Sequence, residues 1–392
     1  MLLVTERIIF DMTTTVRPIE NRIVALDVLR GFALFGVLMV NMLDFSSSAL
    51  RASTLGMRGN ELDQIIDLAI AFFAVVKFYL LFSFLFGIGF AVQMRRMEAN
   101  NRPFVMFYLR RLFFLFVIGF GHSILLWDGD ILRLYAIAGV MLLLVRGLST
   151  RILLGLAGLI ALGGLLIFSF TDIMQMSDMI GLDAIPLYMN GTYWELVNYR
   201  LNMGHVLDIQ IPMVLVMFLL GLVVGRSGVL DDPARYTPFL RRWWKFALPV
   251  GLLGNLFLLL GFQENQSWMI SFGLHVGAPA LSFVYVSFVL LNAQKLRALA
   301  PVGQMALTNY LTHSLVCTTL FYGYGFGLYN QLAPTVTFLL VFVIFGAQMV
   351  ISKWWMSQYR FGLMEWAWRS LTYWQIQPIT RKPLTNASES AS

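Results

Sequence analysis

Ten apolar stretches separated by polar connectors dominate this 392-residue chain. They lie at roughly 23–43, 78–94, 105–126, 131–145, 151–170, 209–227, 245–262, 269–292, 304–325 and 333–352. A helix needs about 20 apolar residues to cross the hydrocarbon core of a bilayer. Only 12% of the residues are charged, about half the usual fraction in a soluble domain. The sequence therefore predicts an all-α, polytopic membrane bundle of about ten transmembrane helices, and it excludes a water-soluble globule.

The charged residues predict the orientation of this bundle. Most of the 28 Lys and Arg residues fall in alternate connectors and in the two terminal segments, whereas acidic residues favour the remaining connectors. Since positive residues collect on the cytoplasmic side of a membrane, we expect both termini to be cytoplasmic. The net charge of +7 then reflects orientation, and no nucleic acid partner is expected.

Four segments can be separated by composition. The first two are a cytoplasmic N-terminal segment at 1–22 and an N-terminal transmembrane bundle at 23–229. A C-terminal transmembrane region follows at 230–377, and then a polar tail at 378–392 that we expect to be disordered. The loop 228–244 is the predicted boundary between the two transmembrane halves. The acidic outer loop 171–208 is expected to form a short surface helix that partly caps the bundle, and an aromatic helix at the inner leaflet follows the last span.

Charged groups inside spans are costly and therefore indicate function. Asp27 and Arg30 lie three residues apart, on one face of the first predicted helix. One interpretation is a structural ion pair beside Gly31. The other is that Arg30 joins inner arginines such as Arg110 and Arg111 to bind a polyanionic, phosphate-rich donor. Lys77, at an outer edge, is expected to extend its ammonium toward water.

A second cluster lies where the third predicted span ends at the outer side. His122 is followed by Asp128 and Asp130 in a tight turn. An imidazole beside a carboxylate is the smallest general base with an orienting partner, so these three residues are candidate catalytic groups. The alternative is that both aspartates form a solvated turn and cap the next helix, while His122 binds a backbone carbonyl.

Other motifs indicate packing. His275 and His313 are typical of interhelical hydrogen bonding, and the single cysteine, Cys317, of a small packing residue. No metal-binding motif is present, so no metal site is expected. Gly87 and Gly89 lie in a predicted helix without the rest of a phosphate-binding fingerprint, which favours close helix packing.

Several blocks of the sequence together resemble the YeiB-like family of bacterial multispanning membrane proteins. The blocks are Ile23–Asn41, Phe78–Phe90, Trp127–Leu132, Gly303–Tyr310 and Gly362–Arg369. In that family the back half is a region of unknown function. The resemblance implies a multi-pass protein of the bacterial inner (cytoplasmic) membrane, in contact with membrane lipids.

The front half is more distantly similar to transmembrane acyltransferases of the heparan-α-glucosaminide N-acetyltransferase type. The similarity carries over Asp27, Arg30 and Gly31. It does not carry over the catalytic histidine of those enzymes, which follows their first span, because residues 44–63 contain none. It implies that cytosolic acyl-coenzyme A donates an acyl group to an extracytoplasmic acceptor.

The preferred hypothesis is therefore acyl transfer across the membrane, with acyl-coenzyme A as donor and His122 as general base. The acceptor would be a small molecule or a component of the cell envelope. A transporter or exporter of a small or lipid-like solute is the alternative, and a structural or accessory membrane protein is a third interpretation. Oligomeric state is open, with a homodimer among the options.

Overall fold

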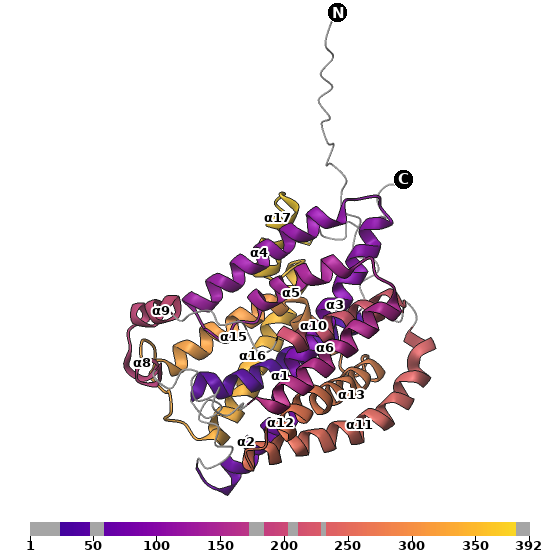
Figure 1. Ribbon diagram of the computed structural model, residues 1–392. Helices are drawn as coiled ribbons and strands as arrows, with labels where there is room; N and C mark the ends of the chain where they lie inside the picture. The colour runs from indigo at the N-terminus through magenta and orange to yellow at the C-terminus, as the bar shows by residue number, and fades with distance from the viewer. Residues whose placement is uncertain (1–23, 48–58, 172–183, 203–210, 229–232, 382–392) are drawn as a thin grey trace, which may run out of the picture.

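The fold is described from a computed structural model, which covers residues 24–47, 59–171, 184–202, 211–228 and 233–381. The predicted N-terminal segment 1–22, most of the tail 378–392, and parts of the outer loop 171–208 and of the loop 228–244 lie outside these residues. No strand occurs within the described ranges, and the helices pack side by side as a single bundle (Figure 1). The predicted all-α fold is confirmed.

The first half of the bundle contains α1 (Val24–Ser46), α2 (Glu61–Phe73), α3 (Lys77–Glu98), α4 (Phe104–Leu125), α5 (Leu132–Val145), α6 (Thr150–Phe170), α8 (Ile185–Asn190), α9 (Tyr193–Asn202) and α10 (Ile211–Arg226). The second half contains α11 (Pro233–Gln263), α12 (Ser267–Phe272), η2 (Gly273–Gly277), α13 (Ala278–Leu291), η3 (Arg297–Leu299), α14 (Ala300–Gln304), α15 (Ala306–Phe321), α16 (Pro334–Gln358) and α17 (Leu363–Tyr373). Here η2 is a turn of π-helix and η3 is a 3-10 turn.

Seven helical spans in the described part of the chain are long and apolar enough to cross a membrane. They are α1, α2 with α3, α4, α6, most of α11, α12 through α13, and α16. Three further predicted spans correspond to the shorter helices α5, α10 and α15, of 14, 16 and 16 residues. This arrangement is consistent with the predicted polytopic membrane bundle.

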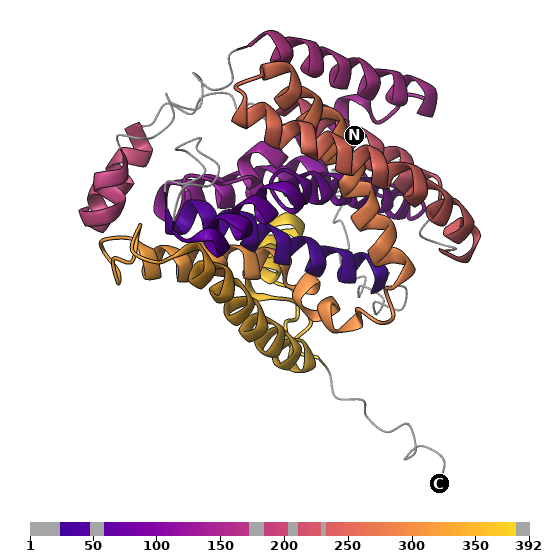
Figure 2. The same ribbon diagram turned by 90° about the horizontal axis from the view of Figure 1, so that it is seen from below.

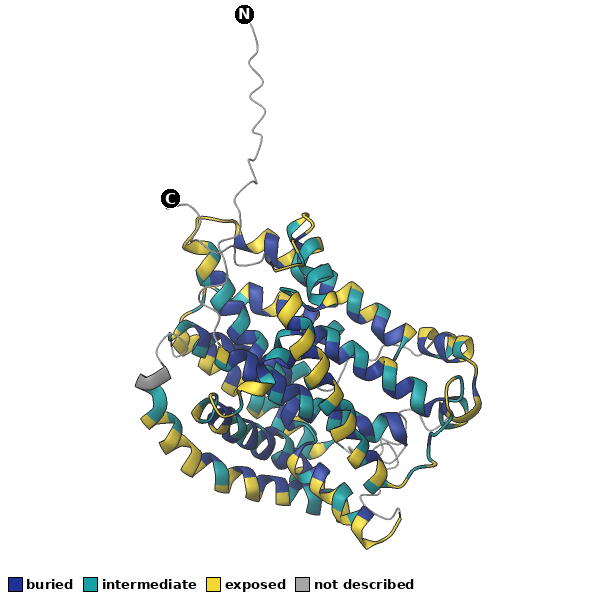
Figure 3. Cartoon of the chain, turned by 180° about the vertical axis from the view of Figure 1, so that it is seen from behind, coloured by how far each residue is buried: buried dark blue, intermediate teal, exposed yellow. Residues whose placement is uncertain are grey.

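The bundle has an apolar exterior and a central pair of helices. Helices α1 and α3 run through the middle, with α6 on one side and α16 on the other (Figure 2). The outer helices carry many exposed residues (Figure 3). Large apolar side chains are among them, such as Leu159 and Ile167 on α6 and Val343 and Val350 on α16. Such an apolar surface can contact the acyl chains of membrane lipids. The backbone polar groups need no water there, because they are hydrogen-bonded within the helices.

Glycines allow α3 and α10 to approach closely. A Cβ atom added to Gly87 would collide with the Phe218 carbonyl oxygen and lie 3.0 Å from the Gly221 Cα. The reciprocal addition at Gly221 would lie 2.9 Å from the Gly87 Cα. Gly87 therefore serves close helix packing, as its sequence predicts, whereas the nearest atom to a Cβ at Gly89 would be Arg30 Nη2, 4.0 Å away.

The two transmembrane halves share one core. Gly303 on α14 lies against the backbone of Asp27 on α1, and a Cβ at Gly31 would meet the Leu299 carbonyl. Helix α17 follows the last span, as predicted for an interfacial helix, and packs its Tyr373 ring on Phe107 of α4, with ring centroids 4.9 Å apart. Sequence blocks from both ends of the chain thus meet inside the bundle.

Two expectations fail. The loop predicted at 228–244 is mostly helix, because α11 begins at Pro233, a position at which proline loses no hydrogen bond. Lys77 does not extend toward water: its side chain is fully buried, and Nζ donates to the Ala71 carbonyl oxygen over 3.1 Å. Lys77 begins α3 just after the break that follows α2, so its Nζ can donate to a carbonyl oxygen near the α2 C-terminus, where a cation is favourable.

Candidate functional site

His122, near the end of α4, is held between two side chains. Its Nδ1 lies 2.7 Å from Asp130 Oδ2, and its Nε2 lies 2.8 Å from Ser314 Oγ. With Asp130 ionised, Nδ1 carries the proton and donates it to the carboxylate, so Nε2 accepts the hydrogen bond from the Ser314 hydroxyl. All three residues are buried. The order carboxylate, imidazole, hydroxyl is that of a nucleophile with its general base and orienting acid.

Asp130 combines both roles that the sequence left as alternatives. Its Oδ2 contacts His122, while its Oδ1 accepts the Arg133 backbone N–H at 2.9 Å and so caps the first turn of α5. The second bond fixes the carboxylate in place. The turn between α4 and α5 therefore brings Asp130 to His122 in a fixed orientation.

Asp128, the second aspartate predicted for this site, faces a different neighbour. Its Oδ1 accepts a hydrogen bond from the Tyr188 hydroxyl of α8 at 3.0 Å. Both ring nitrogens of His122 are already used by Asp130 and Ser314. Asp128 therefore connects the turn to the outer helix α8, and Asp130 is the residue that orients the imidazole.

Ser314 is a site residue that the sequence interpretation missed. It is fully buried on α15, and 192 residues separate it from His122. The one sequence feature that indicated Ser314 was its place in the hydroxyl-rich run Thr308–Ser314, next to His313. Helix α15 presents Ser314 to α4 and His313 to α16, because successive helical residues point about 100° apart.

Glu365 secures the start of the helix that carries Ser314. Its Oε1 accepts the backbone N–H of Leu307 at 2.6 Å, and its Oε2 accepts the Thr308 hydroxyl, also at 2.6 Å. A carboxylate at a helix N-terminus is stabilising. Burial raises the pKa of the Glu365 carboxyl, while the hydrogen bonds from Thr308 act in the opposite direction. Helix α17 thereby positions α15.

Aromatic rings and neighbouring helices cover the site. The His122 ring lies 5.1 Å from the Tyr310 ring and 6.4 Å from the Trp127 ring, measured between centroids. At the same end of the bundle, α8 and α9 lie beside the ends of α4 and α15 (Figure 1). This matches the short helical cap predicted for the outer loop and shields the buried polar groups from water.

Gly119 provides the space for this turn, and its replacement gives a direct test. A Cβ there would lie 2.7 Å from the Arg133 backbone nitrogen and 2.8 Å from Asp130 Oδ1. We expect Gly119→Ala to lower the free energy of unfolding by about 1–3 kcal/mol, because the turn must shift. Thermal unfolding in detergent measures this. Gly121→Ala, with nothing within 4 Å of its Cβ, is the matched control. Equal effects of the two variants contradict the role of Gly119.

The predicted donor-binding residues lie away from His122: Asp27 and Arg30 are in the first two turns of α1, and Arg110 and Arg111 are in the first half of α4. Asp27 Oδ1 pairs with Arg30 Nη1 at 3.2 Å. The Arg111 guanidinium stacks 3.8 Å from the centre of the Trp368 ring, and the Trp368 indole N–H donates to the Arg111 carbonyl oxygen. The like charges of Arg30 and of Arg369 on α17 lie near enough to repel the Arg111 guanidinium. We call Arg30, Arg111 and Arg369 the basic cluster.

The basic cluster differs from the prediction in two residues. Arg369 belongs to it and was not predicted, because it comes from α17, far along the chain. Arg110 was predicted; successive helical residues point about 100° apart, so it faces away from Arg111 on α4, and its Nε is buried without a hydrogen-bond partner among the described residues.

His275 and His313, the other two histidines among the described residues, make hydrogen bonds away from this site. His275 Nδ1 lies 2.9 Å from the Ser271 carbonyl oxygen, and the ring packs against Gly164 of α6. His313 Nε2 lies 2.6 Å from Gln348 Oε1 on α16. The His313 contact joins α15 to α16 and is the interhelical hydrogen bonding that the sequence suggested, whereas the His275 bond lies within one helical span. Within the described residues, no group of three metal-ligating side chains occurs.

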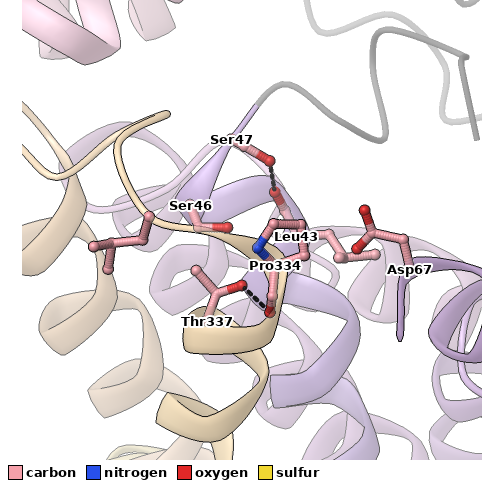
Figure 4. Close-up of a pocket in the computed structure, with 7 residues that line it drawn as sticks. Leu43, Ser46, Ser47, Asp67, Pro334 and Thr337 are labelled. Atoms are coloured by element: carbon pink, nitrogen blue, oxygen red, sulfur yellow. Dashed lines mark hydrogen bonds between the residues drawn. The ribbon is translucent and has the colours of Figure 1, made fainter. Parts of the chain in front are cut away.

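A shallow pocket elsewhere does not provide a second site. It lies between α1, α2 and α16 and is lined by Ser47, Asp67 and Thr337 among others (Figure 4). Its volume of about 10 Å³ is near the minimum for one water molecule. The Ser47 and Thr337 hydroxyls bond to backbone carbonyls of their own helices.

Comparison with known proteins places the chain in a family. Residues 224–375 match the family described as "Protein of unknown function (DUF418)". The chain is 35% identical to the uncharacterized protein YxaH of Bacillus subtilis, over 93% of this chain and 97% of that protein. It is 30% identical to the uncharacterized protein YeiB of Escherichia coli, over 92% and 99%. The chain belongs to the YeiB-like family.

The DUF418 region contributes only part of the site. Ser314 and Glu365 lie inside residues 224–375, whereas His122 and Asp130 lie in the half that precedes it. The relatives match nearly the whole chain, so both halves of the site fall within the matched length. The arrangement of Ser314, His122 and Asp130 therefore requires the complete bundle.

Proposed function

We propose that this protein is a membrane-embedded acyltransferase that takes an acyl group from coenzyme A and passes it through Ser314 to an acceptor on the far side of the membrane. The observation that supports this most is the hydrogen-bonded series Asp130, His122 and Ser314. A serine hydroxyl is a weak nucleophile unless a base removes its proton as it attacks. A buried, oriented imidazole is suited to that task.

The reaction has two steps, acylation of Ser314 and transfer of the acyl group to the acceptor. In the first, Ser314 Oγ attacks the thioester carbonyl while His122 Nε2 takes the hydroxyl proton, and the imidazolium protonates the departing thiolate. The products are an acyl-serine ester and free coenzyme A. In the second, His122 takes a proton from the acceptor hydroxyl or amine, which attacks the ester, and then returns that proton to Ser314 Oγ. Asp130 stabilises the imidazolium in both steps.

Donor binding is assigned to the basic cluster. Arg111 and His122 are eleven residues apart on α4, which places them on nearly the same helix face at a separation of about 16 Å along the axis. Guanidinium groups bind phosphate oxygens through paired hydrogen bonds. The phosphates of acyl-coenzyme A would stay at the cluster while the pantetheine arm extends along α4 toward Ser314.

The charge pattern supports the direction of transfer. The basic cluster lies at the end of the bundle that carries the excess of Lys and Arg, which we assign to the cytoplasmic side. His122 and the cap formed by α8 and α9 then face the extracytoplasmic side. In a bacterium this corresponds to the inner membrane, with a small molecule or a cell-envelope component as acceptor.

Replacing Arg111 tests the assignment of the donor site. We expect Arg111→Gln to weaken binding of acetyl-coenzyme A by about 10- to 100-fold, since a charge-assisted hydrogen bond contributes about 1.5–3 kcal/mol. Isothermal titration calorimetry on the detergent-purified protein measures this. The control is Arg151→Gln, which removes an exposed arginine from the start of α6. Wild-type affinity in Arg111→Gln contradicts the assignment.

A further inference from the structure

Arg200 on α9 is a buried cation with unused hydrogen-bonding capacity. The residue is 1% exposed and is among the largest fully buried side chains. Its Nη1 donates to the Ile124 carbonyl oxygen at 3.3 Å. Its Nε and Nη2 have no hydrogen-bond partner in the described part of the chain. A buried guanidinium with two unsatisfied nitrogens carries a free-energy cost that a structural role must offset or a ligand must relieve.

The unsatisfied nitrogens form one edge of the guanidinium. Nε and Nη2 direct two parallel N–H bonds to the same side, and this is the edge that binds both oxygens of a carboxylate or phosphate. The bond from Nη1 caps the C-terminus of α4, where a cation is favourable, and accounts for only one nitrogen. Helix capping therefore anchors Arg200 and leaves its anion-binding edge available.

The surroundings of Arg200 suit a polar ligand beside the catalytic residues. The guanidinium carbon lies 5.8 Å from the Tyr322 ring centre, and the Tyr322 and Tyr188 rings are 4.9 Å apart. Ile124, which Arg200 contacts, is two residues beyond His122. Tyr188 bonds to Asp128, in the turn that holds Asp130. Arg200 thus lies beside the hydrogen-bonded series Asp130, His122 and Ser314, on the side of the membrane assigned to the acceptor.

We propose that Arg200 binds an oxyanion, a carboxylate or a phosphate, carried by the acyl acceptor. The acceptor would thus be an anionic molecule whose hydroxyl or amine reaches Ser314. The acceptor role rests on the proposed acyltransferase function, whereas anion binding does not. Arg200 is the one Lys or Arg of the loop 171–208, which also carries five Asp and Glu, so an anion that binds here depends on direct contact with the Arg200 guanidinium.

The test measures thermal unfolding of the purified full-length protein in zwitterionic detergent. The probes are sodium phosphate and sodium acetate at constant ionic strength, and nanodiscs of phosphatidylglycerol compared with phosphatidylcholine. We expect at least one anion to raise the wild-type midpoint saturably. A response to soluble anions indicates a free solute, and a response to phosphatidylglycerol alone indicates a lipid headgroup. Either response supports the proposed anion site if it is weakened or lost when Arg200 is replaced.

Two variants establish that requirement. Arg200→Gln removes the charge, and Arg200→Lys keeps the charge but loses the paired N–H edge, so the second remains informative if the first fails to fold. We expect Arg200→Lys to need at least tenfold more anion, and Arg151→Gln to respond as wild type does. Equal responses in wild type and Arg200→Lys, or no response to any probe, overturn the proposal. So does an Asp183→Asn or Asp208→Asn variant that loses as much stability as Arg200→Gln, because the chain would then supply the anion.

The two proposals can fail separately. A saturable, Arg200-dependent response in a protein that releases no thiol from acetyl-coenzyme A supports the anion site and rejects the acyltransferase. Thiol release without any Arg200-dependent response does the reverse.

Discussion

Replacing His122 by alanine is expected to reduce the release of coenzyme A thiol from acetyl-coenzyme A by about 100- to 10,000-fold. That range is the usual contribution of a positioned general acid or base. His122 is the only residue bonded to both Asp130 and Ser314 in the described structure, so its loss leaves Ser314 without a base. The initial rate with purified protein, followed by a thiol reagent, measures the effect.

A second histidine provides the control for this experiment. His275 is also buried, but it bonds to a backbone carbonyl within its own helix and packs against α6. His275→Ala therefore removes comparable volume away from the site and is expected to keep the wild-type rate once correctly folded protein is selected. A folded His122→Ala variant that retains a tenth or more of the wild-type rate contradicts the proposed base.

Replacing Ser314 by alanine is expected to have a comparable effect for a different reason. The variant keeps the base and its carboxylate but removes the atom that accepts the acyl group, so the acyl-serine ester cannot form. We expect thiol release to fall by at least 100-fold, and Ser314→Cys to restore part of it because a thiol can also be acylated. The same thiol assay measures both.

The control serine is Ser282 on α13. It is as buried as Ser314, but its hydroxyl bonds to backbone carbonyls of Lys77 and Ala278. Ser282→Ala should leave the rate unchanged. If Ser314→Ala transfers acyl groups at the wild-type rate, His122 activates the acceptor directly, and the covalent step is wrong.

Local patterns allowed part of the site to be predicted from sequence. The ten apolar stretches indicated the bundle. Only the end of α4 and one turn, seven residues in all, separate His122 from Asp130, so their approach could be predicted. The roles of Gly87 and α17 followed from residue type and position. These features depend on neighbours in sequence, where helical periodicity and turn length set the geometry.

Features that depend on how distant helices pack could not be predicted. Ser314 lies 192 residues from His122, and Arg369 reaches Arg111 only through α17. Burial of Lys77 and Arg200 depends on which carbonyl groups the folded chain places nearby. A single sequence contains no signal for these pairings. The start of α11 at Pro233 was missed because proline there reads equally as loop or as helix start.

The alternative of a solute transporter makes a different prediction for the same residues. A transport role predicts that deletion changes uptake or efflux of a solute, and that His122→Ala and Ser314→Ala act without any acyl-coenzyme A turnover. Wild-type protein that releases no thiol from acetyl-coenzyme A favours this alternative over acyl transfer. The two classes therefore separate on one activity.

Acylation of Ser314 is tested most directly by mass spectrometry. Purified protein is incubated with acetyl-coenzyme A labelled in the acetyl group, without acceptor, quenched in acid and digested. We expect one labelled acetyl ester on the peptide containing Ser314, removed by hydroxylamine and absent from the Ser314→Ala and His122→Ala variants. Acylation of Ser314 is contradicted if the wild-type protein releases thiol while Ser314 stays unmodified, or if the label persists in Ser314→Ala.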